Sequence, residues 1–153
     1  PALALDRLWA VVRLNRPAAR LFGALGVGVG DSLLELMLSD RLPPVVENWP
    51  EVAHHAAARL RAESAAQGGL EPLDHAARQL AAVPGPRDGP LGPVVPTVLA
   101  LGGTRLSLFA TIAQFGTAED VTLDDLKIEL YFPADDATAA QLAAMDAPQP
   151  RDA

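Results

Sequence analysis

Three histidines, four serines and two pairs of adjacent aspartates are the side chains that could bind a metal or perform catalysis. His54 and His55 are neighbours, and neighbouring residues on a helix point about 100° apart, so they cannot chelate one ion together. His75 has no second ligand at a metal-binding spacing, and none of the serines stands in a triad or nucleophile-elbow setting. We expect no metal, no cofactor and no catalytic constellation. An enzyme that uses a His and an Asp as an acid–base pair is a further alternative, but no spacing in the sequence supports such a pair.

Two further patterns have simpler structural interpretations. The segment Gly26-Val-Gly-Val-Gly30 lacks the GxGxxG spacing of a dinucleotide site, and no Lys-Ser/Thr follows it. We interpret it as a loop that ends in a helix cap at Asp31 and Ser32. Adjacent acids at Asp124-Asp125 and Asp135-Asp136 are typical of caps or solubilising charges.

Composition narrows the class of protein. The 153 residues fit one domain, half of them are hydrophobic, and the formal charge of −7 would repel nucleic acid. Without cysteine there are no disulfides, which suits a cytoplasmic protein, and no apolar run is long enough to span a membrane. Strand-like sequence follows Pro1 at once, so we expect the chain to be part of a longer protein.

The elements that must position any site fall into three groups. Two short apolar runs within residues 3–14 predict a hairpin, and Asn15 before Arg16-Pro17 predicts the start of a helix. Further helices are predicted after Ser32, from about Asn48 to Ala66, and around residues 73–80. The breaker-rich segment 84–93 predicts an exposed loop.

The C-terminal part changes to a strand pattern. Residues 97–101 and 105–115, joined by Gly102-Gly103, predict a second hairpin, and residues 126–132 predict another strand. A last helix is predicted over 137–145. The order predicts an α+β fold: an antiparallel sheet of about five strands with helices packed on one face. Residues 1–146 are the expected domain, and 147–153 a disordered tail.

Periodicity predicts which side chains face the core. In the last strand, Ile128 and Leu130 alternate with Lys127, Glu129 and Tyr131, so we expect the aliphatic residues to face the helices and the polar ones to face water. Leu106 and Leu108 share one face of the preceding strand. On the long helix, the stripe expected to face the core contains Trp49, Val52, Ala53, Ala56 and Leu60, with Arg59 outside it.

These residues resemble a known family, the ligand-binding domain of MmyB-like transcription regulators. The resemblance lies in Ala4-Leu-Asp-x-x-Trp9-x-Val11, in Asn15-Arg-Pro-Ala-Ala-Arg-Leu-Phe-Gly23, and in the helix from Asn48-Trp49 to Leu60-Arg61. Phe115-Gly-Thr, Asp120-Val-Thr-Leu and Phe132-Pro-Ala-Asp135 resemble one branch of it. The resemblance implies a PAS-like fold, a fatty-acid-like ligand and an N-terminal helix-turn-helix domain that binds DNA and is absent here.

Our main hypothesis is therefore a sensor that holds an apolar ligand between sheet and helices. Small Ala side chains on the helix stripe opposite a Leu- and Ile-rich sheet leave volume for it. A carboxylate head group would need cations, for which Arg59 and His55 come first and Arg105 next. The apolar lining is expected from Phe22, Met37, Trp49, Val52, Ala56, Leu60, Leu106, Leu108, Ile128 and Leu130.

The alternative is a dimerisation module with the same PAS-like fold and a filled core. It rests on Phe109, Thr111, Ala113 and Phe115, which share the face of their strand opposite the expected core. Either hypothesis allows a homodimer.

Overall fold

A computed structural model describes residues 1–85, 94–114 and 126–146, and within them ten elements confirm the predicted α+β fold. The strands are β1 (Ala2–Leu5), β2 (Val11–Leu14), β3 (Thr97–Leu101), β4 (Thr104–Gln114) and β5 (Lys127–Pro133). The helices are α1 (Arg16–Ala24), α2 (Leu33–Leu38), α3 (Trp49–Ala66), α4 (Glu71–Ala81) and α5 (Asp136–Asp146).

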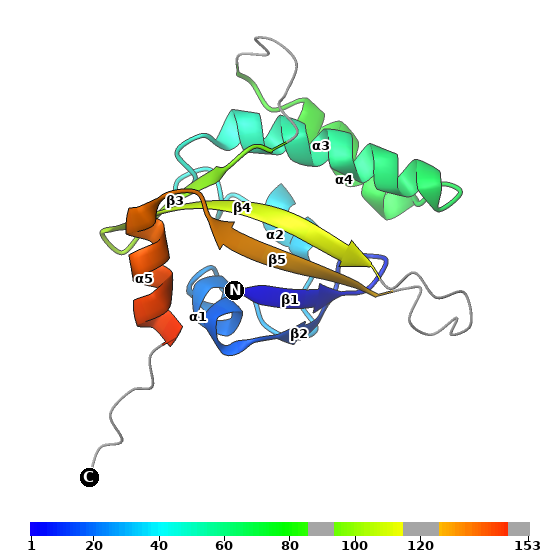
Figure 1. Ribbon diagram of the computed structural model, residues 1–153. Helices are drawn as coiled ribbons and strands as arrows, with labels where there is room; N and C mark the ends of the chain where they lie inside the picture. Colours follow the sequence, from blue (N-terminus) through cyan, green and yellow to red (C-terminus); the bar gives the residue numbers. More distant parts are fainter. Residues whose placement is uncertain (86–93, 115–125, 147–153) are drawn as a thin grey trace.

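One antiparallel sheet contains all these strands, in the order β2-β1-β5-β4-β3 (Figure 1). The two predicted hairpins, β1–β2 and β3–β4, are confirmed, and β5 pairs between them. Gly102 and Gly103 both have positive φ, at 55° and 80°, as the tight primed turn of a hairpin requires. The sheet is curled.

The predicted helix starts are also confirmed. The Asn15 side chain accepts a hydrogen bond from the backbone N–H of Ala18 at 3.0 Å, and Ser32 caps α2 through the N–H of Glu35 at 3.3 Å. Asp135 does the same for α5, accepting from the N–H of Thr138 at 2.7 Å. The glycine-containing segment before α2 is the predicted loop, in which Asp31 accepts from the N–H of Gly28.

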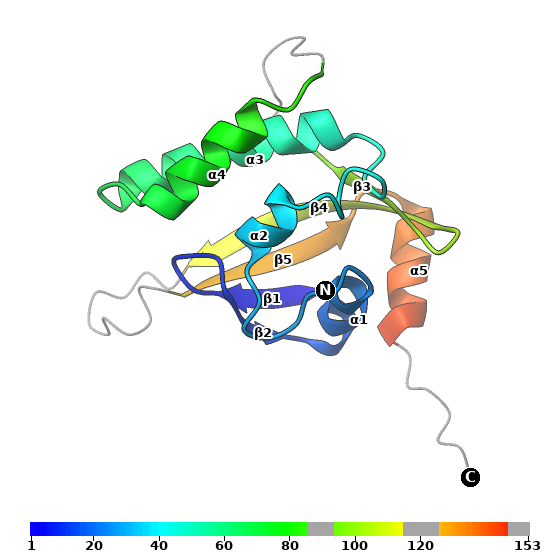
Figure 2. The same cartoon turned by 180° about the vertical axis from the view of Figure 1, so that it is seen from behind.

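The helices enclose the inner face of the sheet. Figure 2 shows α2 in front of the strands, with the paired helices α3 and α4 on one side and α1 on the other. Helix α4 packs closely on α3 and α2, whereas α5 contacts β4, β5 and α1 at one end of the sheet. None of the helices in the described ranges is long and apolar enough to cross a membrane.

The expected orientation of β5 is wrong. The register places Glu129 opposite Leu3 and Lys127 opposite Leu5, and all four of these side chains are buried on the inner face. Ile128 and Leu130 consequently lie on the outer face, because neighbouring strand residues point to opposite sides. The polar side of β5 is the inner side, because α3 supplies charged partners for Lys127 and Glu129.

Several predictions concern residues outside the described ranges. They include residues 86–93 of the predicted 84–93 loop, the family-like motifs of residues 115–125 with Phe115 and Asp124-Asp125, and the tail 147–153.

Candidate functional site

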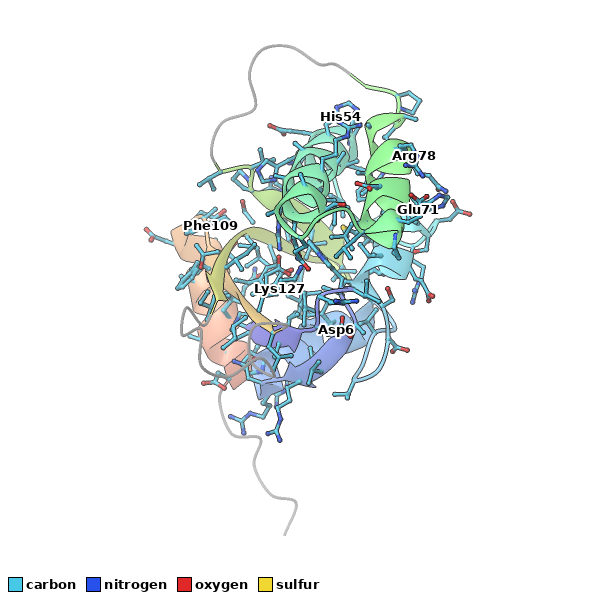
Figure 3. The ribbon with its side chains drawn as sticks, turned by 90° about the vertical axis from the view of Figure 1, so that its right-hand side faces the viewer. Asp6, His54, Glu71, Arg78, Phe109 and Lys127 are labelled. Carbon is cyan, nitrogen blue, oxygen red and sulfur yellow. The ribbon has the colours of Figure 1, made fainter. Side chains whose placement is uncertain are left out.

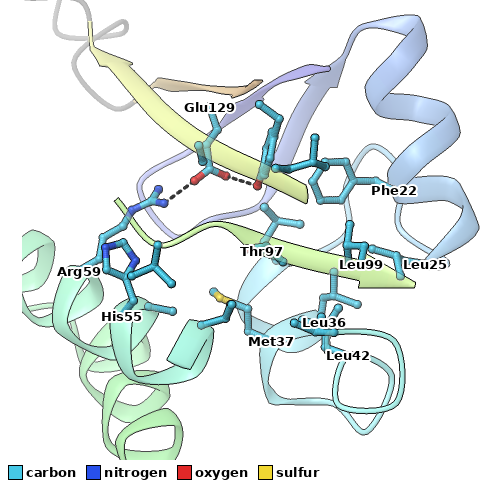
Figure 4. Close-up of a pocket in the computed structure, with 18 of the residues that line it drawn as sticks. Phe22, Leu25, Leu36, Met37, Leu42, His55, Arg59, Thr97, Leu99 and Glu129 are labelled. Atoms are coloured by element: carbon cyan, nitrogen blue, oxygen red, sulfur yellow. Dashed lines mark hydrogen bonds and ion pairs between the residues drawn. The ribbon is translucent and has the colours of Figure 1, made fainter. Parts of the chain in front are cut away.

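A cavity of about 450 Å³ lies between the inner face of the sheet and the helices. This volume falls within the range of about 300–1,000 Å³ that small-molecule pockets occupy. Its apolar end is lined by Phe22 of α1, Leu25 just after that helix, Leu36 of α2, Leu42, and Leu99 of β3 (Figure 4). On the sheet side it extends along β4 past the end of β3, where Ala110 and Ile112 line the cavity and are exposed.

Helix α3 serves two packing surfaces. Ala53, Ala57, Leu60 and Ser64 are buried, and their spacing of three or four residues forms one stripe of the helix. A neighbouring stripe with Val52, His55, Ala56 and Arg59 lines the cavity. The helix is thus apolar on one side, whereas the side that faces the cavity ends in charged residues.

The polar end of the cavity is built from α3 and β5. Arg59 Nη1 lies 2.5 Å from Glu129 Oε1, and the Tyr131 hydroxyl donates to Glu129 Oε2 at 2.8 Å (Figure 4). Glu129 is only 2% exposed. A carboxylate so deeply buried requires a cation and further donors, and here Arg59 and Tyr131 supply them.

Two hydrogen-bond donors of Arg59 have no partner among the described residues. They are Nε and Nη2, and both are buried. These two nitrogens form one edge of the planar guanidinium, the edge that grips a carboxylate with two parallel hydrogen bonds. Leaving such donors unsatisfied costs about 1–3 kcal/mol each. Arg59 thus lines the cavity with two buried, unpaired donors, and a carboxylate reaches this edge once the guanidinium turns toward the cavity.

A second ion pair lies one helical turn further along α3. Lys127 pairs with Glu63, which also accepts a hydrogen bond from the Trp9 indole N–H at 3.1 Å. The Lys127 ammonium lies 3.8 Å from the centre of the Trp9 ring, and the Arg59 guanidinium carbon 4.5 Å from it. Figure 3 shows Lys127 in the interior of the molecule. One aromatic ring thus contacts both cations.

The turn between β1 and β2 directs Trp9 inward. Trp9 is the one non-glycine residue of the described ranges with a positive φ, at 66°. The Asp6 carboxylate holds the turn by accepting from the N–H groups of Leu8 and Ala10 at 2.9 and 2.8 Å. A left-handed conformation costs about 1–2 kcal/mol, which the indole contacts and the Asp6 hydrogen bonds offset.

The two ion pairs can form side by side because the spacing of the charged residues along the helix nearly equals their spacing along the strand. Arg59 and Glu63 are separated by four helical residues, or about 6 Å, and Glu129 and Lys127 by two strand residues, or about 7 Å. The charges alternate on both elements, so each cation faces an anion. A slip of one residue in β5 would turn both charges to the outer face.

Burial controls the protonation of these groups. Desolvation, and then the adjacent Arg59, lower the pKa of His55, against the smaller opposing effect of Glu51. Burial and the nearby Glu129 raise the pKa of Tyr131 well above its ordinary value, so its hydroxyl stays a donor. Desolvation lowers the pKa of Lys127 from 10.5 to about 8, although the hydrogen bond with Glu63 opposes the shift.

The cavity brings together some of the expected site residues and not others. Those that line it are Phe22, Met37, Trp49, Val52, Ala56, Leu108, His55 and Arg59. Leu60 and Leu106 are buried in the core without lining it, and Ile128 and Leu130 lie on the other face of the sheet. Arg105 is exposed and paired with Glu47 at 3.0 Å, so it contributes to the surface and not to the cavity.

Sequence reasoning missed Glu129, Tyr131, Lys127, Glu63 and Trp9. The signal was present as complementary charge patterns, Arg59 with Glu63 on the helix and Lys127 with Glu129 on the strand. Taken alone, either charge pattern is typical of a solvent-exposed face of a helix or strand. Only the pairing of the two elements reveals that both are buried.

One of three comparisons with known proteins found a match. Residues 1–145 match the family described as the MmyB-like transcription regulator ligand binding domain. The chain belongs to this family. Neither the curated proteins nor the solved structures yielded a match. In the described part of this MmyB-like domain, no three His, Cys, Asp or Glu side chains form a group that could hold a metal ion.

The lowered pKa of Lys127 predicts how the stability of this MmyB-like domain changes with pH. The folded state releases the Lys127 proton near pH 8 and the unfolded state near 10.5, so between these values the unfolded chain binds more protons. The free energy of unfolding should therefore receive a contribution that rises with pH, by up to about 1 kcal/mol per pH unit. Urea denaturation at a series of pH values measures it.

The variant Lys127→Met lacks this proton and should lack the rise. Because the single change leaves Glu63 without its cation, the double variant Glu63→Gln/Lys127→Met is the better folded reference. A wild-type curve that stays parallel to that of the double variant from about pH 8 to about pH 10 would contradict the assignment.

Proposed function

We propose that this domain is a non-catalytic sensor that binds a fatty-acid-like amphiphile, with its tail in the apolar cavity and its head group on Arg59. The observation that carries the proposal is the free Nε and Nη2 edge of Arg59, buried at the polar end of an otherwise apolar cavity. A carboxylate presents two acceptors in the geometry of that edge.

The lining supports an acyl tail. From Arg59 the cavity continues to Met37 and the cluster of Phe22, Leu25 and Leu36 (Figure 4). Transfer of each methylene group into such surroundings is favourable by about 0.8 kcal/mol. The flexible Met37 can adjust to tails of different shape.

Family membership supports a role in transcription control. We propose that ligand binding changes the orientation of a helix-turn-helix domain elsewhere in the same cytoplasmic protein, and that DNA is contacted only through that domain. A net charge of −7 makes direct DNA contact by this part unfavourable. Control requires that ligand binds the two states of the regulator with different affinities. Binding of this kind needs no cofactor.

Replacement of the head-group cation tests the site. Arg59→Met should lower the affinity for decanoate by about tenfold to a hundredfold, because the charged hydrogen bonds are lost. Arg61→Met on the exposed side of the same helix is the matched control and should bind as the wild type does. Isothermal titration calorimetry measures both.

Because Arg59→Met leaves Glu129 buried without its cation, Arg59→Met/Glu129→Leu serves as a second variant that removes both charges. Equal decanoate affinity of the wild type and of this folded double variant would reject the head-group site.

Filling the cavity tests the tail site independently. Ala56 lines the cavity, so the ring of Ala56→Phe should enter it and reduce decanoate affinity at least about tenfold, with the fold retained. Ala58→Phe places the same ring on the exposed side of α3 and should have no effect. Native mass spectrometry with added decanoate should show an adduct for the wild type and Ala58→Phe but not for Ala56→Phe. An adduct on all three would contradict the assigned cavity.

A second candidate function is dimerisation through the outer face of the sheet. Phe109 and Phe132 stack there with ring centres 5.6 Å apart, and Phe132 is 43% exposed. The register adds the cross-strand pairs Thr111–Leu130 and Ala113–Ile128 to the same face. A largely apolar sheet face of this kind is typical of a protein interface.

Phe132→Ser should weaken self-association at least about tenfold, because aromatic residues dominate interface energies. Val29→Ser is the control, because Val29 is 68% exposed and lies in a loop distant in sequence from Phe132. Sedimentation equilibrium at several protein concentrations, with and without decanoate, measures the dimer. A wild-type protein that stays monomeric throughout would exclude this interface.

A further inference from the structure

The charge balance of the cavity limits what can bind there. Among its described lining residues, Arg59 and Glu129 form an ion pair whose charges cancel, whereas burial and then Arg59 lower the pKa of His55 and so favour its neutral form. A carboxylate on the free edge of Arg59 would leave the polar end with one uncompensated negative charge. Buried charge without compensation is unfavourable, so such a site gains from taking up a proton.

His55 is placed to accept that proton. It lies one helical turn before Arg59 on α3 and lines the same end of the cavity (Figure 4). The charged and titratable groups around it are Arg59 and Glu51 on its own helix and Glu129 and Tyr131 across the cavity. Glu129 is already held by Arg59 and Tyr131, and Tyr131 donates its proton to Glu129. His55 is therefore the nearby group that can gain a proton without breaking an existing contact.

We propose that an acidic ligand enters this cavity together with one proton, which His55 takes up as the carboxylate docks on Arg59. His55 is then a specificity residue: as imidazolium it favours carboxylic acids over neutral amphiphiles of the same length. The inference rests on the proposed ligand-binding function and adds to it the chemical class of the head group and the dependence of binding on pH.

Isothermal titration calorimetry in two buffers of different ionisation enthalpy counts the protons taken up on binding. Decanoate should bind with uptake of close to one proton, and its affinity should rise by up to about tenfold per pH unit as the pH falls through the neutral range. Decan-1-ol, which has the same tail and no charge, should bind without uptake and with little pH dependence.

Two histidine variants assign the proton. His55→Gln should remove the uptake and flatten the pH dependence for decanoate, while decan-1-ol still binds. His54→Gln is the matched control, because His54 does not line the cavity (Figure 3). Its Nε2 lies at hydrogen-bond distance, 2.9 Å, from the carbonyl oxygen of Val83. His54→Gln should retain the uptake.

The outcomes separate this inference from the proposed function. Decanoate binding without proton uptake would overturn the inference and leave the proposed function intact. Uptake that persists in His55→Gln would overturn the assignment to His55. If neither decanoate nor decan-1-ol binds the folded wild-type domain, the proposed function itself fails.

Discussion

Two buried ion pairs between α3 and β5, joined by Trp9, are the interaction on which the site depends. Helix α3 packs its backbone closely on α4, and in the described residues no strand approaches it in the same way. Long side chains span the space instead: Arg59 and Glu63 from the helix, Glu129 and Lys127 from the strand. A helix held at this distance leaves a volume beside it that short aliphatic side chains do not fill. The cavity and the polar end thus have one origin.

Alanine supports this arrangement from the other side of α3. Ala53 and Ala57 of α3 and Ala76 and Ala77 of α4 are almost completely buried, which lets the two helices approach closely. The helix pair gains its stability from its own interface and can do without a filled contact to the sheet. Protein interiors are otherwise close-packed, so the position of the empty volume is specific to the face of α3 that carries His55 and Arg59.

Local sequence signals were sufficient for the fold and insufficient for the site. Caps such as Asn15 and Ser32, the glycine pair at residues 102–103 and the change from helical to strand periodicity act between near neighbours, so one sequence reveals them. The burial of Lys127 and Glu129 depends on residues more than sixty positions away in α3. Hydrophobic alternation cannot show this, because the rule that the apolar side faces inward fails where a second element supplies opposite charges. The same reasoning that misplaced Ile128 and Leu130 missed Glu129 as the partner of Arg59.

Both tryptophans of the chain, Trp9 and Trp49, line the cavity. Indole emission depends on the polarity and the charges around the ring, and Trp9 has two cations beside it while Trp49 stands on the first turn of α3. The intrinsic fluorescence of this domain therefore comes almost wholly from the walls of its candidate site. The molecule carries its own optical report on whether that space is empty or occupied, without any attached dye.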